Sequence, residues 1–154
     1  MNNTGSPNLM KAFLTLLLII GFGPLQAQLW QDSYTDALEL AKSKEKPLIV
    51  VFSGSDWCGP CIRMKKKVLD SEEFSEHAKE NYVLYNADFP KKKQNQLSPE
   101  LSAANRSLAE RYNPEGYFPL IVVLDKDENL LGKTGYYPRF GPRKYIDLLN
   151  DFIR

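Results

Sequence analysis

An apolar strand segment that leads into a Cys-X-X-Cys turn constrains this chain more than any other feature. Residues 48–52 are a continuous run of leucine, isoleucine, valine and phenylalanine, which is typical of a strand covered on both faces of a sheet. A short turn over residues 53–57 follows, and after it come the only two cysteines, Cys58 and Cys61. The next residues, up to about position 69, have helical character. The pattern therefore predicts a strand, a turn and a helix whose first turn holds both cysteines.

This placement gives the two cysteines different chemical roles. Cys58 lies at the N-terminus of the predicted helix, where unpaired backbone N–H groups and the helix dipole stabilise a thiolate. Residues three apart in a first helical turn share a face, so Cys61 can reach Cys58 and close a small disulfide ring. Pro60 leaves no N–H unpaired in this turn and fixes a helical φ. We expect Cys58 to be the exposed nucleophile and Cys61 the resolving thiol.

Two other uses of a cysteine pair are less favoured. A zinc site would need two more ligands, and the only histidine, His77, is expected to be a solvated residue on a short helix. A purely structural disulfide would close a loop too small to stabilise the fold much. We therefore expect no metal site and no added cofactor. The Cys58–Cys61 disulfide would itself be the redox group.

The N-terminal segment predicts export. An apolar run over residues 12–22 follows Lys11 and precedes a small residue, Ala27. This order is typical of a secretory signal peptide over residues 1–27, with cleavage after Ala27. An uncleaved anchor is the alternative, but the run is shorter than the roughly 20 residues that a membrane span needs. Residues 28–154 would then form a single domain in the periplasm or another exported compartment, where disulfides can form.

Length and charge narrow the class of protein further. A chain of 154 residues with 43% hydrophobic and 25% charged residues is long enough for one folded domain, and this composition excludes disorder and a multi-span membrane protein. Its 20 basic and 19 acidic residues give a net charge of +1, which offers no reason to expect nucleic acid as a partner. We expect a monomer.

Hydrophobic periodicity predicts strands that alternate with helices in the remainder of the chain. A capping box from Asp70 to Glu73 is expected to start one helix, and Ser98 followed by Pro99 to start another. This alternation predicts an α/β fold with a central mixed sheet and helices on both faces. The expected strands are 48–52, 82–87, 120–124 and 130–134; the helices are 36–41, 61–69, 70–80, 99–112 and 145–153; and the buried stripe of the 99–112 helix is Leu101, Ala104, Leu108 and Tyr112.

The motif Trp57-Cys58-Gly59-Pro60-Cys61 after an apolar strand resembles the active site of the thioredoxin superfamily. The resemblance runs from about Tyr34 to the C-terminus. It implies a thioredoxin fold with a cis bond between Phe118 and Pro119 and with Pro119 facing the cysteines. Trp57, Phe118 and Pro119 would bind substrate, while Gly59 and Pro60 support the motif. Residues 52–58 and 88–90 are similar to exported reductases of the periplasmic disulfide-bond (Dsb) group.

The sequence departs from the thioredoxin pattern beneath the second cysteine. The superfamily usually buries an aspartate there, and the matching position is Phe52 by direct count or Val51 if the turn is one residue longer. The lysine that usually accompanies the aspartate would fall near Leu84, which is also apolar. We therefore expect no carboxylate under Cys61. Leu120 also replaces the threonine that commonly follows the cis proline.

The resemblance implies an enzyme, an exported thiol–disulfide oxidoreductase that reduces or isomerises protein disulfides through the Cys58/Cys61 cycle. Gly59-Pro60 is the dipeptide of the reducing members, which favours that direction. Its substrates would be protein disulfides, and a membrane or periplasmic redox partner would recycle the pair. A disulfide-donating oxidase, a reductant for cytochrome maturation and a redox-inert binding module on the same scaffold are the alternatives.

Overall fold

β2 lies at the centre of a five-stranded mixed sheet in the computed structural model, which describes residues 29–154. It pairs in parallel with β3 and antiparallel with β4, and the strand order is β1-β3-β2-β4-β5. Every residue of β2 is buried, as expected for a strand covered on both faces. The strands are β1 (Trp30–Gln31), β2 (Leu48–Ser53), β3 (Val83–Asp88), β4 (Leu120–Leu124) and β5 (Leu130–Thr134).

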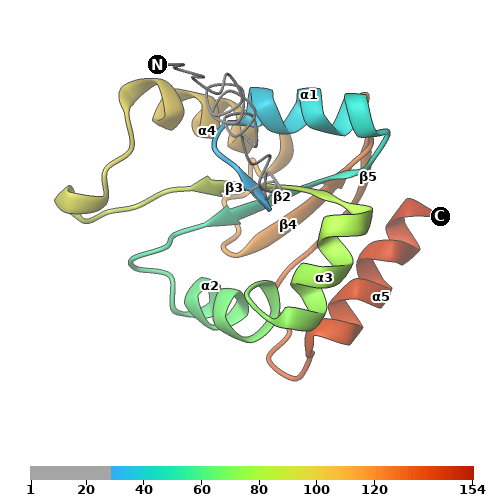
Figure 1. Ribbon diagram of the computed structural model, residues 1–154. Coiled ribbons are helices and arrows are strands. Elements are labelled where there is room, and N and C mark those ends of the chain that lie inside the picture. The colour runs from blue at the N-terminus through green and yellow to red at the C-terminus, as the bar shows by residue number, and fades with distance from the viewer. Residues whose placement is uncertain (1–28) are drawn as a thin grey trace, which may run out of the picture.

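Helices cover both faces of this sheet (Figure 1). Alternate residues of each central strand point to opposite faces, so the sheet divides the apolar side chains into two clusters. One cluster packs under α1 (Tyr34–Lys44) and α4 (Pro99–Tyr112). The other packs under α2 (Gly59–Met64), the π-helical turn η1 (Lys65–Leu69), α3 (Glu72–Asn81) and α5 (Pro142–Ile153). The expected thioredoxin fold with helices on both faces is confirmed.

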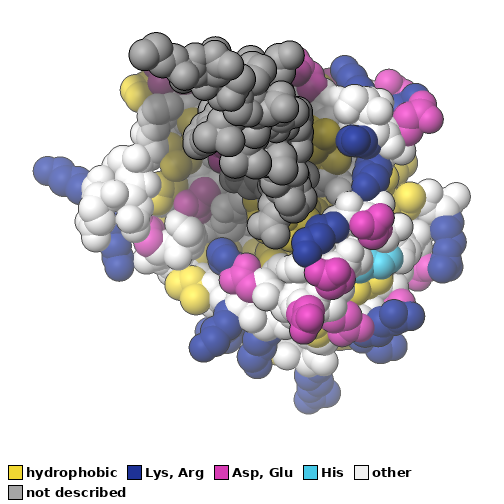
Figure 2. Space-filling model, in the orientation of Figure 1, with side chains coloured by type: hydrophobic (Ala, Val, Ile, Leu, Met, Phe, Trp, Pro, Cys, Tyr) yellow, Lys and Arg dark blue, Asp and Glu magenta, His cyan; other side chains and the backbone are white. Residues whose placement is uncertain are grey.

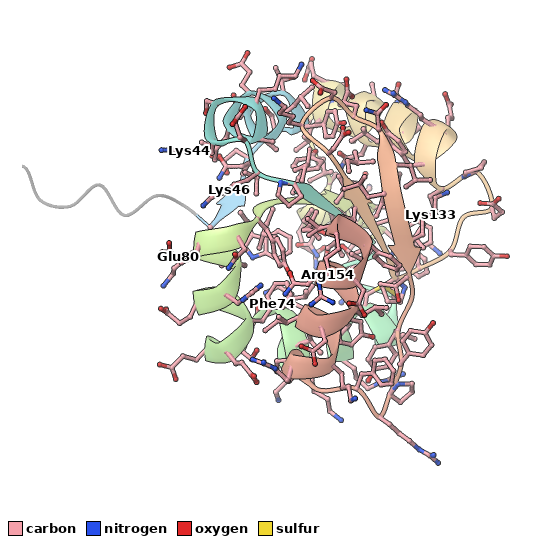
Figure 3. The ribbon with its side chains drawn as sticks, turned by 90° about the vertical axis from the view of Figure 1, so that its right-hand side faces the viewer. Lys44, Lys46, Phe74, Glu80, Lys133 and Arg154 are labelled. Carbon is pink, nitrogen blue, oxygen red and sulfur yellow. A yellow bond between two sulfur atoms is a disulfide. The ribbon has the colours of Figure 1, made fainter. Side chains whose placement is uncertain are left out.

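The second cluster holds the helices that follow the cysteine motif against the sheet. Phe74 of α3 is fully buried and lies between α3 and α5 in Figure 3, whereas Glu80 of the same helix points outward. A short 3-10 turn, η2 (Lys93–Asn95), interrupts the long connection from β3 to α4. In residues 29–154, no helix combines the length and apolarity needed to cross a membrane. The predicted signal peptide lies outside the described residues.

Two local expectations were wrong. The N-cap of α3 is Ser71, whose hydroxyl accepts the Phe74 N–H, and not Asp70. The reason is that the Asp70 N–H donates to the Lys65 carbonyl and so completes the preceding π-helical turn, to which Asp70 still belongs. In α4, Ala104 is exposed and Asn105 is buried, so one polar side chain lies within the apolar stripe.

The remaining elements match the sequence pattern closely. β4 and β5 have the expected bounds, and β3 is shifted by one residue. Ser98 caps α4 as expected, since its hydroxyl accepts the Leu101 N–H. The strand that the pattern misses is β1, which has only two residues.

Candidate active site

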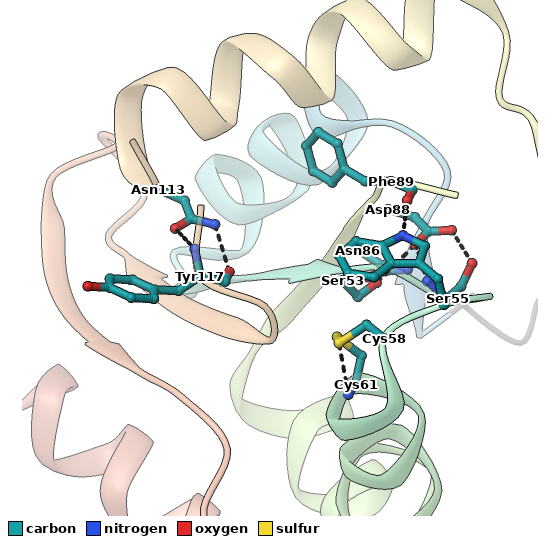
Figure 4. The surroundings of a disulfide bond; sticks show 10 residues. Ser53, Ser55, Cys58, Cys61, Asn86, Asp88, Phe89, Asn113 and Tyr117 are labelled. Atoms are coloured by element: carbon teal, nitrogen blue, oxygen red, sulfur yellow. Dashed lines mark hydrogen bonds between the residues drawn. A yellow bond between two sulfur atoms is a disulfide. The ribbon is translucent and has the colours of Figure 1, made fainter. Parts of the chain in front are cut away.

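The two cysteines lie where β2 ends and α2 begins, and they form a disulfide (Figure 4). Cys58 is the N-cap of α2, as predicted, and its Sγ accepts the Cys61 backbone N–H at 3.2 Å. Pro60 occupies the first helical turn. A negative charge that develops on the Cys58 sulfur therefore meets a backbone donor and the positive end of the helix.

The expected exposure of Cys58 is wrong for this oxidised form. Cys58 and Cys61 are each only 4% exposed. The disulfide explains this, because it ties the Cys58 sulfur back onto the first turn of α2. In the disulfide form, burial therefore does not distinguish the two sulfurs.

Trp57 forms the rim of the site beside the cysteines. Its indole Nε1 donates to the Phe89 carbonyl at 2.7 Å, and its ring meets the edge of Phe118 at 5.5 Å between centroids. The ring nevertheless stays 40% exposed. A Cβ at Gly54 would lie 2.3 Å from the Trp57 ring, so only glycine permits this packing. Trp57 and Phe118, both predicted to bind substrate, are thus brought together.

A lysine-rich loop, residues 89–98, is fastened to the motif through Asp56. The Asp56 carboxylate accepts the backbone N–H groups of Lys91 and Lys92, both at 2.9 Å, and the Asn95 amide at 3.0 Å. These donors, the Lys91 N–H foremost, lower the pKa of Asp56. The Lys91 Nζ lies 4.0 Å from the centroid of the Trp57 ring, in a cation–π contact. Figure 2 shows Lys and Arg side chains over this loop at the left of the molecule.

The Phe118–Pro119 peptide bond is cis, as the resemblance implies. Tyr117, which precedes Phe118, is held by Asn113, whose buried side chain lies just after α4. Its amide nitrogen donates to the Tyr117 carbonyl and its amide oxygen accepts the Tyr117 N–H, both at 2.9 Å. Asn113 thereby acts as a strand-like partner for Tyr117 and fixes the approach to Pro119. The Tyr117 ring itself is 62% exposed.

A cavity of about 320 Å³ lies beside Cys61, and both Cys61 and Pro119 line it. Val51 also lines this cavity, whereas Phe52 packs on the opposite face of the sheet under α1 and α4. Val51 therefore occupies the place of the usual aspartate. Leu84 is buried in the same apolar cluster as Val51, and the β2–β3 register places Asn86 directly beside Val51 and Leu84 beside Ile49.

The surroundings of Cys61 are consequently more polar than the sequence suggested. Ser53 and Asn86 line the same cavity, and the Ser53 hydroxyl lies 2.7 Å from Asn86 Oδ1. Asp70 lines this cavity as well. Its carboxylate forms an ion pair with Lys65 at 2.6 Å, and both side chains are largely solvent-accessible. The expectation that no carboxylate lies under Cys61 stays a prediction: Val51 is apolar as expected, and the Asp70 carboxylate lies at the wall of the same cavity.

Asp88, at the end of β3, joins this polar group. One carboxylate oxygen accepts the Ser55 N–H at 2.8 Å and lies 3.2 Å from the Ser53 hydroxyl, and the other accepts the Ser55 hydroxyl. The Asp88 backbone is held in turn by Asn105, whose amide donates to its carbonyl at 3.0 Å. Burial raises the pKa of Tyr85 to about 12, so its hydroxyl stays protonated and donates to Asn105 at neutral pH.

His77 lies on α3, in a different part of the fold. It lies on the predicted short helix and is partly solvated, with one side against Tyr82 and Nε2 at 3.2 Å from the Tyr82 hydroxyl. Tyr82 belongs to the apolar cluster beneath α3 and α5, and it brings the ring inward. Among residues 29–154, no three His, Cys, Asp or Glu side chains are grouped so as to hold a metal ion.

A thioredoxin fold whose first helix after the central strand begins with a Cys-X-X-Cys pair, next to a cis proline, defines the class of thiol–disulfide oxidoreductases. The chain belongs to the thioredoxin-like family, whose family model matches residues 29–126. It is 36% identical over 115 residues to the disulfide bond reductase DsbH of Chlamydia pneumoniae. The aligned residues cover 75% of this chain and 68% of that protein.

Two further comparisons agree with this assignment. A solved structure of a DsbH oxidoreductase superimposes with a TM-score of 0.74 at 32% identity, over 88% of this chain and 92% of that one. The thioredoxin-related protein DsbJ of C. pneumoniae is 29% identical over 136 residues, which are 83% of this chain but only 38% of DsbJ.

Proposed function

We propose that this protein is an exported enzyme that reduces or isomerises protein disulfides through the Cys58–Cys61 pair. The observation that carries the proposal is the disulfide itself, set at the start of α2 with Cys61 and Pro119 on one cavity. The relationship to DsbH, a disulfide bond reductase by name, supports the same direction. Export rests on the signal-peptide pattern of residues 1–27 and on the relationship to Dsb proteins.

The reaction consists of two thiol–disulfide exchanges. The Cys58 thiolate attacks one sulfur of the client disulfide, forms a mixed disulfide and releases the first client thiolate. Cys61 loses its proton and attacks the Cys58 sulfur, which releases the second client thiolate. The client gains two electrons, and the pair becomes the disulfide seen in the structure. A membrane or periplasmic thiol partner must then reduce the pair again.

The surface around the disulfide offers a place for an extended client segment. Trp57 and Phe118 form an aromatic edge next to the cysteines, and Pro119 follows Phe118 directly. We assign client binding to these three residues. Gly59 and Pro60 carry the chain into the first turn of α2.

Insulin reduction tests this function directly. With dithiothreitol as the electron source, we expect the protein to speed the precipitation of reduced insulin about tenfold over dithiothreitol alone. An ordinary thiol with a pKa of about 8.5 is only about 3% ionised at pH 7. Because the helix N-terminus stabilises the Cys58 thiolate, we expect a larger fraction of Cys58 to be ionised and able to attack. The Cys58→Ser variant is the matched control and should show no acceleration. Equal rates for the wild type and this variant would instead indicate a redox-inert binding module.

A further inference from the structure

The Ser53 hydroxyl is placed between two hydrogen-bond acceptors. Asn86 Oδ1 lies at 2.7 Å and Asp88 Oδ1 at 3.2 Å from its oxygen. A serine hydroxyl has a single hydrogen, so it can serve only one of these acceptors fully at a time. The hydroxyl hydrogen therefore has two orientations, one toward the amide oxygen of Asn86 and one toward the carboxylate of Asp88.

Ser53 and the resolving cysteine share one cavity. Ser53 is only 9% exposed, and it lines the cavity that also holds Cys61. Toward either acceptor the Ser53 hydroxyl is the donor, so the lone pairs of its oxygen remain available to accept a hydrogen bond. Figure 4 shows Ser53, Asn86 and Asp88 together next to the disulfide. Most of the cavity's lining is apolar, but Ser53 and Asn86 contribute polar groups to it, and its volume of about 320 Å³ is large enough for several water molecules.

We propose that Ser53 and Asp88 form a relay that accepts the proton of Cys61 when the mixed disulfide is resolved. This inference rests on the proposed function and names the proton acceptor that the missing buried aspartate would otherwise supply. Asp88 acts through Ser53, and Asn86 is a positioning residue that holds the hydroxyl between turnovers.

The relay conserves atoms and charge. The Cys61 thiol gives its proton to a water molecule in the cavity or to the Ser53 oxygen, and Ser53 passes its own hydrogen to Asp88. The Cys61 thiolate then forms a bond to the Cys58 sulfur, and the bond from Cys58 to the client sulfur breaks. The client leaves as a thiolate. Asp88 returns the proton to that thiolate or to solvent.

The fold holds the acceptor in place from two sides. Ser55 donates its N–H and its hydroxyl to the Asp88 carboxylate, and the buried Asn105 holds the Asp88 backbone. Other charged groups also face these positions. The Lys65–Asp70 pair lines the cavity beside Cys61, Lys91 and Arg106 line a groove on the far side of Asp88, and Asp56 is bound to the 89–98 loop. Asp70 is therefore the rival acceptor.

Stopped-flow tryptophan fluorescence tests the relay in the reduced protein. With increasing concentrations of a peptide disulfide, the initial slope reports attack by Cys58, and the plateau rate reports resolution by Cys61. We expect Ser53→Ala and Asp88→Asn to lower the plateau rate about tenfold or more near neutral pH. Both variants should regain the wild-type rate at alkaline pH, where Cys61 ionises without assistance. The attack slope should change by less than about twofold.

Two control variants make the outcome specific. Ser53→Thr keeps the hydroxyl and should keep the wild-type plateau rate. If Asp88→Asn fails to fold, the comparison of Ser53→Ala with Ser53→Thr still tests the relay. Asp70→Asn removes the rival carboxylate and should leave the pH profile unchanged. The relay is overturned by a wild-type plateau rate in Ser53→Ala, by a loss that is equal at every pH, or by a loss in Asp70→Asn. A wild type without any attack phase would contradict the proposed function instead.

Discussion

Replacing Cys61 by serine is expected to trap the enzyme on its clients, whereas replacing Cys58 by serine is expected to abolish activity without trapping. The asymmetry follows from the geometry, because Cys58 is the N-cap whose sulfur accepts a backbone N–H, and Cys61 lies inside the first turn of α2. Without Cys61, the mixed disulfide on Cys58 has no resolving thiol. Non-reducing electrophoresis followed by mass spectrometry will detect the trapped clients.

Alkylation of the reduced wild type provides an independent check on these roles. Iodoacetamide should modify Cys58 first near neutral pH, because the helix N-terminus stabilises its thiolate. Peptide mapping after partial labelling measures the order. Faster labelling of Cys61, or client trapping by the Cys58→Ser variant, would show that the two roles are reversed.

Replacing Val51 by aspartate is expected to destabilise the fold strongly and to add an ionisation to the pH–rate profile. Val51 is 2% exposed and belongs to the apolar cluster beneath α2 and α5, so the new carboxylate would be buried. Lys65 lines the same cavity, but it is already paired with Asp70. We expect the free energy of unfolding to fall by about 3 kcal/mol or more at neutral pH. Urea unfolding at several pH values measures this loss.

The pH dependence of that loss has a defined sign. Burial should raise the pKa of the introduced acid above its unfolded value of about 3.9. The folded state then binds more protons than the unfolded state, so stability falls as the pH rises between the two pKa values. The destabilisation should therefore be smaller at acidic than at neutral pH. Val51→Thr, which is similar in size and uncharged, is the matched control. An equal loss at every pH would contradict burial of the charge.

The sequence predicted the elements that have local signals. The apolar run of β2, the cysteines at the start of α2 and the Ser98 cap of α4 each depend on neighbouring residues, and each lies where expected. The two-residue β1 has no such signal, because it is too short to show a periodicity. The cis bond before Pro119 followed from the family resemblance and not from local chemistry.

The polar surroundings of Cys61 could not be predicted in the same way. Which residue of β3 lies beside Val51 depends on the strand register, and this register places Asn86 there, two residues after Leu84 on the same face. The partners of Asn105, which are Tyr85 and Asp88, become its neighbours only after folding. An asparagine inside the apolar stripe of α4 was the one clue to Asn105.

The reduction potential of the Cys58–Cys61 pair tests the account most directly. Equilibration of the protein with mixtures of reduced and oxidised dithiothreitol, followed by alkylation and mass measurement, gives this potential. For an enzyme that reduces client disulfides through a Gly59-Pro60 motif, we expect a potential near that of thioredoxin, about −270 mV. A potential near about −120 mV, as in the strong oxidant DsbA, would contradict the reductase and indicate an enzyme that donates disulfides.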